Sequence, residues 1–66
     1  MIGDRLKELR TEKKLTQQEI SKMIGVNQNT YSYYETNKIQ PDIATLIKLA
    51  DIYKVSLDYI ADRFSK

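Results

Sequence analysis

Two helix-start signals lie close together within residues 16–35, and the short distance between them restricts how this part of the chain can fold. Thr16 is followed three residues later by Glu19, the capping-box arrangement that begins a helix. Gly25 can adopt the left-handed conformation that ends a helix, and Asn27 is a good N-cap for a second one. The pattern therefore predicts two short helices joined by a turn of about three residues, which is a helix-turn-helix.

Apolar residues at helical spacing predict three further helices, and no stretch alternates apolar and polar residues as a strand would. Leu6 and Leu9 form a narrow stripe on a helix over about residues 3–13. Asp42 and Ser56 are N-caps for two later helices. The positions expected to be buried in the middle three helices are Ile20, Met23, Ile24, Tyr31, Tyr34, Ile43, Leu46, Ile47, Leu49, Ala50 and Tyr53. The apolar positions of the last helix are Leu57, Ile60, Ala61 and Phe64.

The length and composition indicate one domain, residues 1–66, with a small core. The chain contains no cysteine and no histidine, which excludes disulfides and zinc sites built on thiolate or imidazole ligands. Its apolar runs are too short for a membrane span or the core of a signal peptide. We therefore expect a cytoplasmic protein with no metal, no cofactor and no membrane association.

The same inventory argues against catalysis. The two glycines lie 22 positions apart, so there is no glycine-rich phosphate loop. Asp58 and Asp62 share a helix face, but a lone pair of carboxylates binds divalent ions weakly. We expect the protein not to be an enzyme, and no small-molecule substrate is evident.

Positive charge is concentrated in the first part of the chain. Residues 1–40 hold seven Lys and Arg against five acids, whereas residues 41–66 hold four of each. This distribution fits a nucleic-acid partner near the helix-turn-helix, but it fits a solvated surface of mixed sign equally well. Lys13 and Lys14 either lie near such a partner or only solubilise the end of the first helix.

Several groups of residues stand at the spacing of one known family. They are Leu15-Thr16-Gln17-Gln18-Glu19-Ile20, Gly25-Val26, Thr30-Tyr31-Ser32, Glu35, Pro41-Asp42, Leu46-Ile47-Lys48-Leu49-Ala50 and Val55-Ser56-Leu57-Asp58. From about residue 2 to residue 61 the chain resembles the Cro/C1-type (XRE) helix-turn-helix domain of phage and bacterial repressors. The resemblance implies an all-α, five-helix, lambda-repressor-like DNA-binding domain, with the helix-turn-helix at helices 2 and 3, that binds a roughly palindromic operator as a dimer.

The chain departs from the family pattern at four positions. Asn37 and Lys54 stand where glycine is common, so the local cap geometry is open there, although asparagine tolerates a positive φ. Tyr31 and Tyr34 stand where many members carry Ile or Leu. We expect their rings to be partly buried, with the hydroxyls at the edge of the core.

With Tyr31 and Tyr34 facing the core, helical geometry turns the polar side chains of the second motif helix to the opposite face. The residues expected to read bases are Gln28, Asn29, Ser32 and Tyr33. The two amides can contact adenine N6 and N7, the serine adds a short polar contact, and the tyrosine packs on a thymine methyl or reaches a phosphate. The alternative is that these residues only fill a solvated face.

The resemblance places Gln17 and Gln18, at the start of the first motif helix, against the DNA backbone. There their side-chain amides and the free N–H groups of the helix can both donate to phosphate. Asn37 and Lys38, just past the recognition helix, are the other expected phosphate contacts. These contacts position a domain on DNA without carrying sequence information.

Glu35 ends the recognition helix, where a carboxylate beside a phosphate-binding loop would repel DNA. The resemblance implies that it forms an ion pair with Arg10 instead, which would tie the first helix to the recognition helix. The alternative is a solvated glutamate.

Together these features predict sequence-specific binding of double-stranded DNA by a transcriptional regulator, most simply a repressor, with residues 28–35 in the major groove. We expect a homodimer, because one half-site buries too little surface for high specificity. Candidate interface residues are Leu57, Ile60, Ala61 and Phe64, although Leu57 and Ile60 can equally be core residues. The alternative function is a protein-interaction module, such as an antitoxin or anti-repressor adaptor, with Tyr33 as its anchor.

Overall fold

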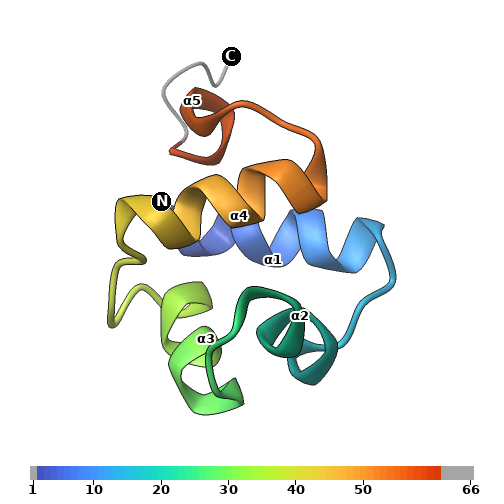
Figure 1. Ribbon diagram of the computed structural model, residues 1–66, viewed down its shortest axis with the longest axis vertical. Coiled ribbons are helices and arrows are strands. Elements are labelled where there is room, and N and C mark those ends of the chain that lie inside the picture. Colours follow the sequence, from blue (N-terminus) through green and yellow to red (C-terminus); the bar gives the residue numbers. More distant parts are fainter. Residues whose placement is uncertain (1, 62–66) are drawn as a thin grey trace.

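The computed structural model describes residues 2–61, which form five α-helices (Figure 1). They are α1 (Ile2–Glu12), α2 (Gln17–Ile24), α3 (Gln28–Glu35), α4 (Ile43–Tyr53) and α5 (Leu57–Ile60). α3 packs against α1 and α2, and α5 packs against α1 and α4. In Figure 1, α2 and α3 lie at one end of the molecule and α5 lies at the other. The predicted all-α, five-helix architecture is confirmed.

Four helices begin at the N-caps that the sequence predicts. Thr16 Oγ1 accepts a hydrogen bond from the Glu19 N–H at 3.0 Å, and the Thr16 N–H donates to Glu19 Oε1 at 2.8 Å, so the capping box is complete. Asn27, Asp42 and Ser56 each accept from the N–H three residues ahead, at 2.8, 2.9 and 3.0 Å. Each cap contributes about 1 kcal/mol, so local signals account for these boundaries.

A residue with a positive, left-handed φ angle follows each of the first four helices. Gly25 ends α2 with a φ of 79°, as predicted. Asn37 and Lys54 adopt φ angles of 64° and 57° without being glycine. Lys14, in the turn between α1 and α2, has a φ of 59°, and the sequence contains no signal for it because lysine has no preference for this region.

The core is formed by buried side chains from all five helices. They are Leu6, Leu9, Ile20, Ile24, Tyr31, Tyr34, Leu49, Ala50, Tyr53 and Ile60. Of the two alternatives for Ile60, core packing is therefore the one observed, while Leu57 is exposed and Ala61 half-buried. Phe64, the other candidate interface residue, and Asp62 lie outside the described residues.

Three predictions of burial are wrong. The exposed fractions of Met23, Ile43 and Ile47 are 54%, 66% and 46%. Helical periodicity shows which side chains share a face of a helix. How much of that face is buried depends on the neighbouring helices. α4 packs against α5 and α2, and Tyr53 also meets Tyr31 of α3, so the side of α4 that carries Leu49 and Tyr53 is the buried one.

None of the helices within residues 2–61 is long and apolar enough to cross a membrane. The longest, α1 and α4, have 11 residues each, whereas a span needs about 20.

Candidate nucleic-acid interface

α3 is held in one orientation by its two buried tyrosines. Tyr31 and Tyr34 have exposed fractions of 0% and 7%, and their rings meet edge to face with centroids 6.0 Å apart. Their burial, with that of Glu35, leaves the opposite side of α3 facing solvent. The predicted base-reading residues lie on that side, with Gln28, Asn29 and Tyr33 exposed and Ser32 half-buried. Gln28 and Asn29 occupy the first turn, which is the part of a recognition helix that reaches base edges.

The hydroxyl of Tyr31 is buried rather than at the edge of the core. It lies 3.2 Å from the hydroxyl of Tyr53 on α4, so the expectation of an edge position is wrong for Tyr31. Burial raises the pKa of both tyrosines above the ordinary value, and both therefore stay protonated at neutral pH. One phenol donates to the other, which satisfies a polar group that would otherwise be costly to bury.

Glu35 is buried and is bound by side chains from two other helices. Its Oε2 accepts a hydrogen bond from Arg10 Nε at 2.6 Å, and its Oε1 accepts from Arg10 Nη2 at 3.2 Å and from Gln17 Nε2 at 3.0 Å. Arg10 also donates through Nη1 to the Leu15 carbonyl at 2.8 Å. The ion pair expected between Arg10 and Glu35 is present, and it joins α1, the following turn, α2 and α3.

The network keeps Glu35 ionised. Burial opposes ionisation, but hydrogen bonds from Arg10, Tyr31 and Gln17 and the charge of Arg10 outweigh it, so the pKa of Glu35 lies below its ordinary value. The hydrogen bond to Glu35 likewise raises the pKa of Arg10. Both partners are therefore charged across the physiological range.

This shift predicts a loss of stability in acid. Because the folded state lowers the pKa of Glu35, its contribution is complete above the unfolded value of about 4.3 and is lost as the pH falls through the lower folded value. Urea denaturation between pH 7 and pH 3 should show a steeper decline for the wild type than for Glu35→Gln, which cannot titrate. Glu12→Gln, on the exposed side of α1, controls for the change in net charge. Parallel curves for the wild type and Glu35→Gln would contradict the prediction.

Gln17 and Gln18 begin α2, and the structure gives them different surroundings. The Gln17 side chain is half-buried and uses one amide proton on Glu35, whereas Gln18 is exposed. Both backbone N–H groups precede the hydrogen bond from the Ile20 N–H to the Thr16 carbonyl, which closes the first turn at 3.1 Å. They belong to the N–H groups that a helix leaves without an internal partner, and such groups can bind an anion.

The loop after α3 folds back over the last turn of that helix. The N–H groups of Lys38 and Ile39 both donate to the Tyr33 carbonyl, at 3.0 and 3.3 Å. Asn37 Oδ1 accepts a hydrogen bond from the Gly3 N–H on α1 at 2.9 Å, so this side chain has a structural role and only its NH₂ group remains for a phosphate. Lys38 extends over the exposed ring of Tyr33, with Nζ 5.5 Å from the ring centroid.

Gly3 supports the site in a way that sequence reasoning missed. A Cβ atom at this position would lie 2.4 Å from the Glu35 carbonyl oxygen and 2.6 Å from that of Tyr34. α1 therefore passes directly over the end of α3, and only glycine fits there. A glycine near a helix boundary carries no sequence signal for such a close approach, because the contact joins residues far apart in the chain.

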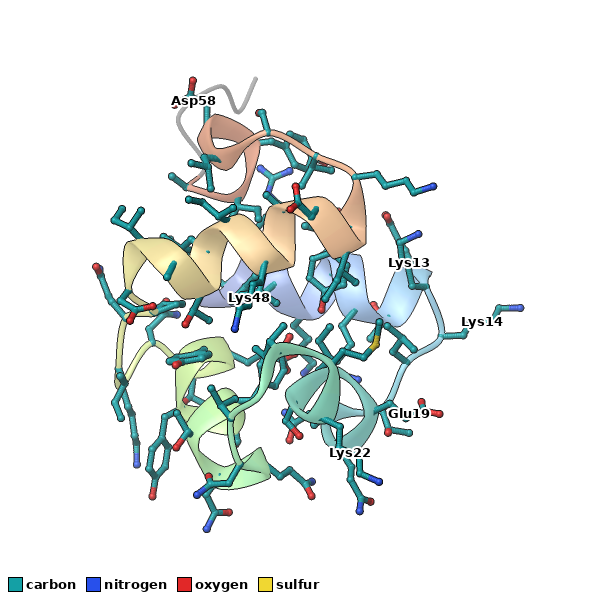
Figure 2. All side chains as sticks on the ribbon, in the orientation of Figure 1. Lys13, Lys14, Glu19, Lys22, Lys48 and Asp58 are labelled. Carbon is teal, nitrogen blue, oxygen red and sulfur yellow. The ribbon has the colours of Figure 1, made fainter. Side chains whose placement is uncertain are left out.

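Figure 2 places the labelled lysines relative to this surface. Lys13 and Lys14 project from the end of α1 on the side away from α3, which favours the interpretation that they solubilise the turn. Lys22 projects from α2 at the same end of the molecule as α3. Among residues 2–61, no group of three or more acidic side chains could hold a metal ion.

Comparisons of the sequence with known proteins agree with this geometry. A helix-turn-helix family model matches residues 6–60. The SPbeta prophage-derived HTH-type transcriptional regulator YonR of Bacillus subtilis (strain 168) is 42% identical over 60 residues, which cover 91% of this chain and 56% of that protein. The cryptic phage CTXphi transcriptional repressor RstR of Vibrio cholerae is 39% identical over 57 residues, which cover 86% and 51%. The chain thus spans about half the length of the curated relatives it matches.

Solved structures show the same arrangement of helices. The P22 c2 repressor protein in complex with synthetic operator 9T superimposes with a TM-score of 0.86 at 28% identity, covering 91% of each chain. The solution structure of the DNA-binding domain of the P22 c2 repressor also gives a TM-score of 0.86, covering 92% of this chain and 80% of that one.

Proposed function

We infer the function of this chain from its family: it belongs to the helix-turn-helix family of the Cro/C1 (XRE) type. The relatives that match it are named transcriptional regulators, not enzymes. We infer that it binds double-stranded DNA sequence-specifically and regulates transcription. The P22 c2 repressor was crystallised with an operator, and RstR is named a repressor, so repression in the bacterial cytoplasm or a phage-infected cell is the mode we propose.

One observation carries this proposal, namely the amide-rich first turn of α3 on the solvent side of the molecule. The buried tyrosines pack the opposite face of α3 against the core. Gln28 and Asn29 are therefore the side chains that would enter a major groove first. Each amide can make a bidentate contact with adenine, which discriminates against other bases by about 1–3 kcal/mol. Ser32, half-buried one turn later, is placed for a shorter contact.

Two segments next to the C-terminal end of α3 carry groups suited to the DNA backbone. The N-terminus of α2 offers the backbone N–H groups of Gln17 and Gln18, and the loop after α3 offers the NH₂ group of Asn37 and the ammonium of Lys38. Phosphate contacts from these two segments, both next to the C-terminal end of α3, would set the depth and register of the recognition helix in the groove. Because such binding releases counterions, we expect the affinity to fall steeply as salt rises.

We also propose that the protein binds its operator as a homodimer. Ile43 and Ile47 lie one turn apart on the same face of α4, and both are exposed, as is Leu57 on α5. These are the described side chains that a second copy of the chain would best cover. Three side chains are far fewer than the ~20–30 residues that each partner contributes to a standard interface, so the dimer would depend on the shared operator for its stability.

Selection from random duplexes tests this function. We expect a two-fold symmetric site to be recovered, with A·T pairs opposite α3 and half-sites one helical turn, ~34 Å, apart. On that site Gln28→Ala should cost about 1–3 kcal/mol and relax the preference at one base pair in each half. The measurement is a gel shift with the selected duplex and its single-base variants.

Gln18→Ala is the matched control, because it removes the same type of side chain from the proposed backbone-contacting end of α2. It should weaken binding equally on all duplexes and leave the base preference unchanged. An unchanged preference in Gln28→Ala would remove Gln28 from the reading set. If no duplex is enriched even at low salt, DNA binding is wrong and a protein-interaction module becomes the better interpretation.

A further inference from the structure

We propose that Tyr33 and Lys38 act as one phosphate clamp beside the recognition helix, so that Tyr33 positions the domain on DNA instead of reading a thymine. The inference rests on the proposed function and decides between the two roles that the sequence leaves open for Tyr33. The clamp would bind a single backbone phosphate through the phenol O–H and the ammonium group.

The backbone brings the two side chains together. The Tyr33 carbonyl accepts three hydrogen bonds from the loop, from the Lys38 N–H at 3.0 Å, the Ile39 N–H at 3.3 Å and Thr36 Oγ1 at 3.3 Å. The loop is also tied to α1 through the bond from the Gly3 N–H to Asn37 Oδ1. Lys38 is therefore held next to Tyr33 before any ligand binds, which lowers the entropic cost of using both groups together.

The position of the ammonium limits what the ring can contact. Lys38 Nζ lies 5.5 Å from the ring centroid of Tyr33, within the range of a cation–π interaction. A thymine methyl packed on this face of the Tyr33 ring would lie against the ammonium group of Lys38. It would remove water from that charge, which is unfavourable. The hydroxyl at the tip of the ring stays available, because Tyr33 is 42% exposed.

The charge of Lys38 is also available for a ligand. Glu35, the nearest carboxylate in sequence, faces the core and is bound by Arg10 and Gln17, so it does not neutralise the lysine. A hydroxyl donor and a cation on two side chains that contact each other suit an anion with several acceptor oxygens, which a phosphate diester provides and a base edge does not.

The test uses the selected duplex, with Tyr33→Phe to remove only the hydroxyl and Lys38→Met to remove the charge while keeping an unbranched stem. We expect each variant to bind about tenfold more weakly, by the same factor on the selected duplex and on its single-base variants. Lys38→Met should also reduce the slope of log K against log salt by about 0.9. The double variant should lose less than the product of the two single losses, because the clamp acts as a unit.

Lys54→Met, at the C-cap of α4, is the charge-matched control, and it should change the affinity and the salt slope less than Lys38→Met. The inference is overturned if Tyr33→Phe binds like the wild type while Tyr33→Ala loses the preference at one base pair, because the ring would then read that base. Multiplicative losses in the double variant would also overturn it. Failure of the wild type to bind any duplex would instead overturn the proposed function, and the two results are therefore distinguishable.

Discussion

Glu35→Ala is expected to lower the free energy of unfolding by ~3–5 kcal/mol, because it leaves the guanidinium of Arg10 in a largely buried position without its partner. The side chain of Glu35 is 3% exposed and that of Arg10 is 12% exposed, so water cannot replace the lost carboxylate fully. The core of a domain this small rarely supplies more than about 3–5 kcal/mol. The variant should therefore be mostly unfolded at 25 °C, which circular dichroism would detect.

Two further variants keep this prediction measurable. Glu35→Gln retains an acceptor oxygen for Arg10 or Gln17 and should show a smaller loss, which urea denaturation can quantify in a protein that still folds. Glu12→Ala removes an exposed carboxylate from α1 and should change stability by no more than about 0.5 kcal/mol. A loss below about 1 kcal/mol in Glu35→Ala would mean that the pair behaves as a solvated surface ion pair.

Gly3→Ala is expected to destabilise the protein by about 1–3 kcal/mol, although replacing a helical glycine by alanine ordinarily stabilises by about 0.5–1 kcal/mol. The reason for the reversed sign is the Glu35 carbonyl oxygen, which lies 2.4 Å from the position of the new Cβ atom. That atom belongs to the backbone, so α1 would have to move away from α3. The movement would also strain the hydrogen bond from the Gly3 N–H to Asn37.

The other glycine provides a contrast with a different cause. A Cβ atom on Gly25 meets no atom within 4 Å, but the φ of 79° makes any side chain costly, by about 1–2 kcal/mol. Gly25→Asn should recover part of the loss in Gly25→Ala, because asparagine tolerates this region, whereas Gly3→Asn should be no better than Gly3→Ala. Thermal melts of the four variants test both explanations, and a stabilised Gly3→Ala would contradict the close approach of α1 and α3.

Much of the candidate site could be predicted from local sequence. The solvent face of α3 follows from the burial of Tyr31 and Tyr34, because a helix that buries one face must expose the opposite one. The surroundings of Gln17 could not be predicted in the same way. Its side chain binds Glu35, 18 positions away, and no periodicity in the chain reports that α2 and α3 meet at those two residues.

The exposed isoleucines of α4 show the same limit in the core. Ile43 and Ile47 satisfy the helical pattern as well as Leu49 does, yet only Leu49 is buried. The difference is set by where the neighbouring helices lie against α4, which no signal within α4 contains. Apolar spacing therefore gives the direction of a buried face, while the packing of the neighbours gives its width.

Local residue patterns are enough to predict where most of the helices begin and end. The hydrogen bonds of the caps at Thr16, Asn27, Asp42 and Ser56 join residues three positions apart, so they depend only on residues that are close together in the sequence. The contacts of Gly3 with Asn37 and of Tyr31 with Tyr53 span 34 and 22 positions, and no local pattern predicts them. Such pairs depend on how the helices pack, and packing is a property of the whole core.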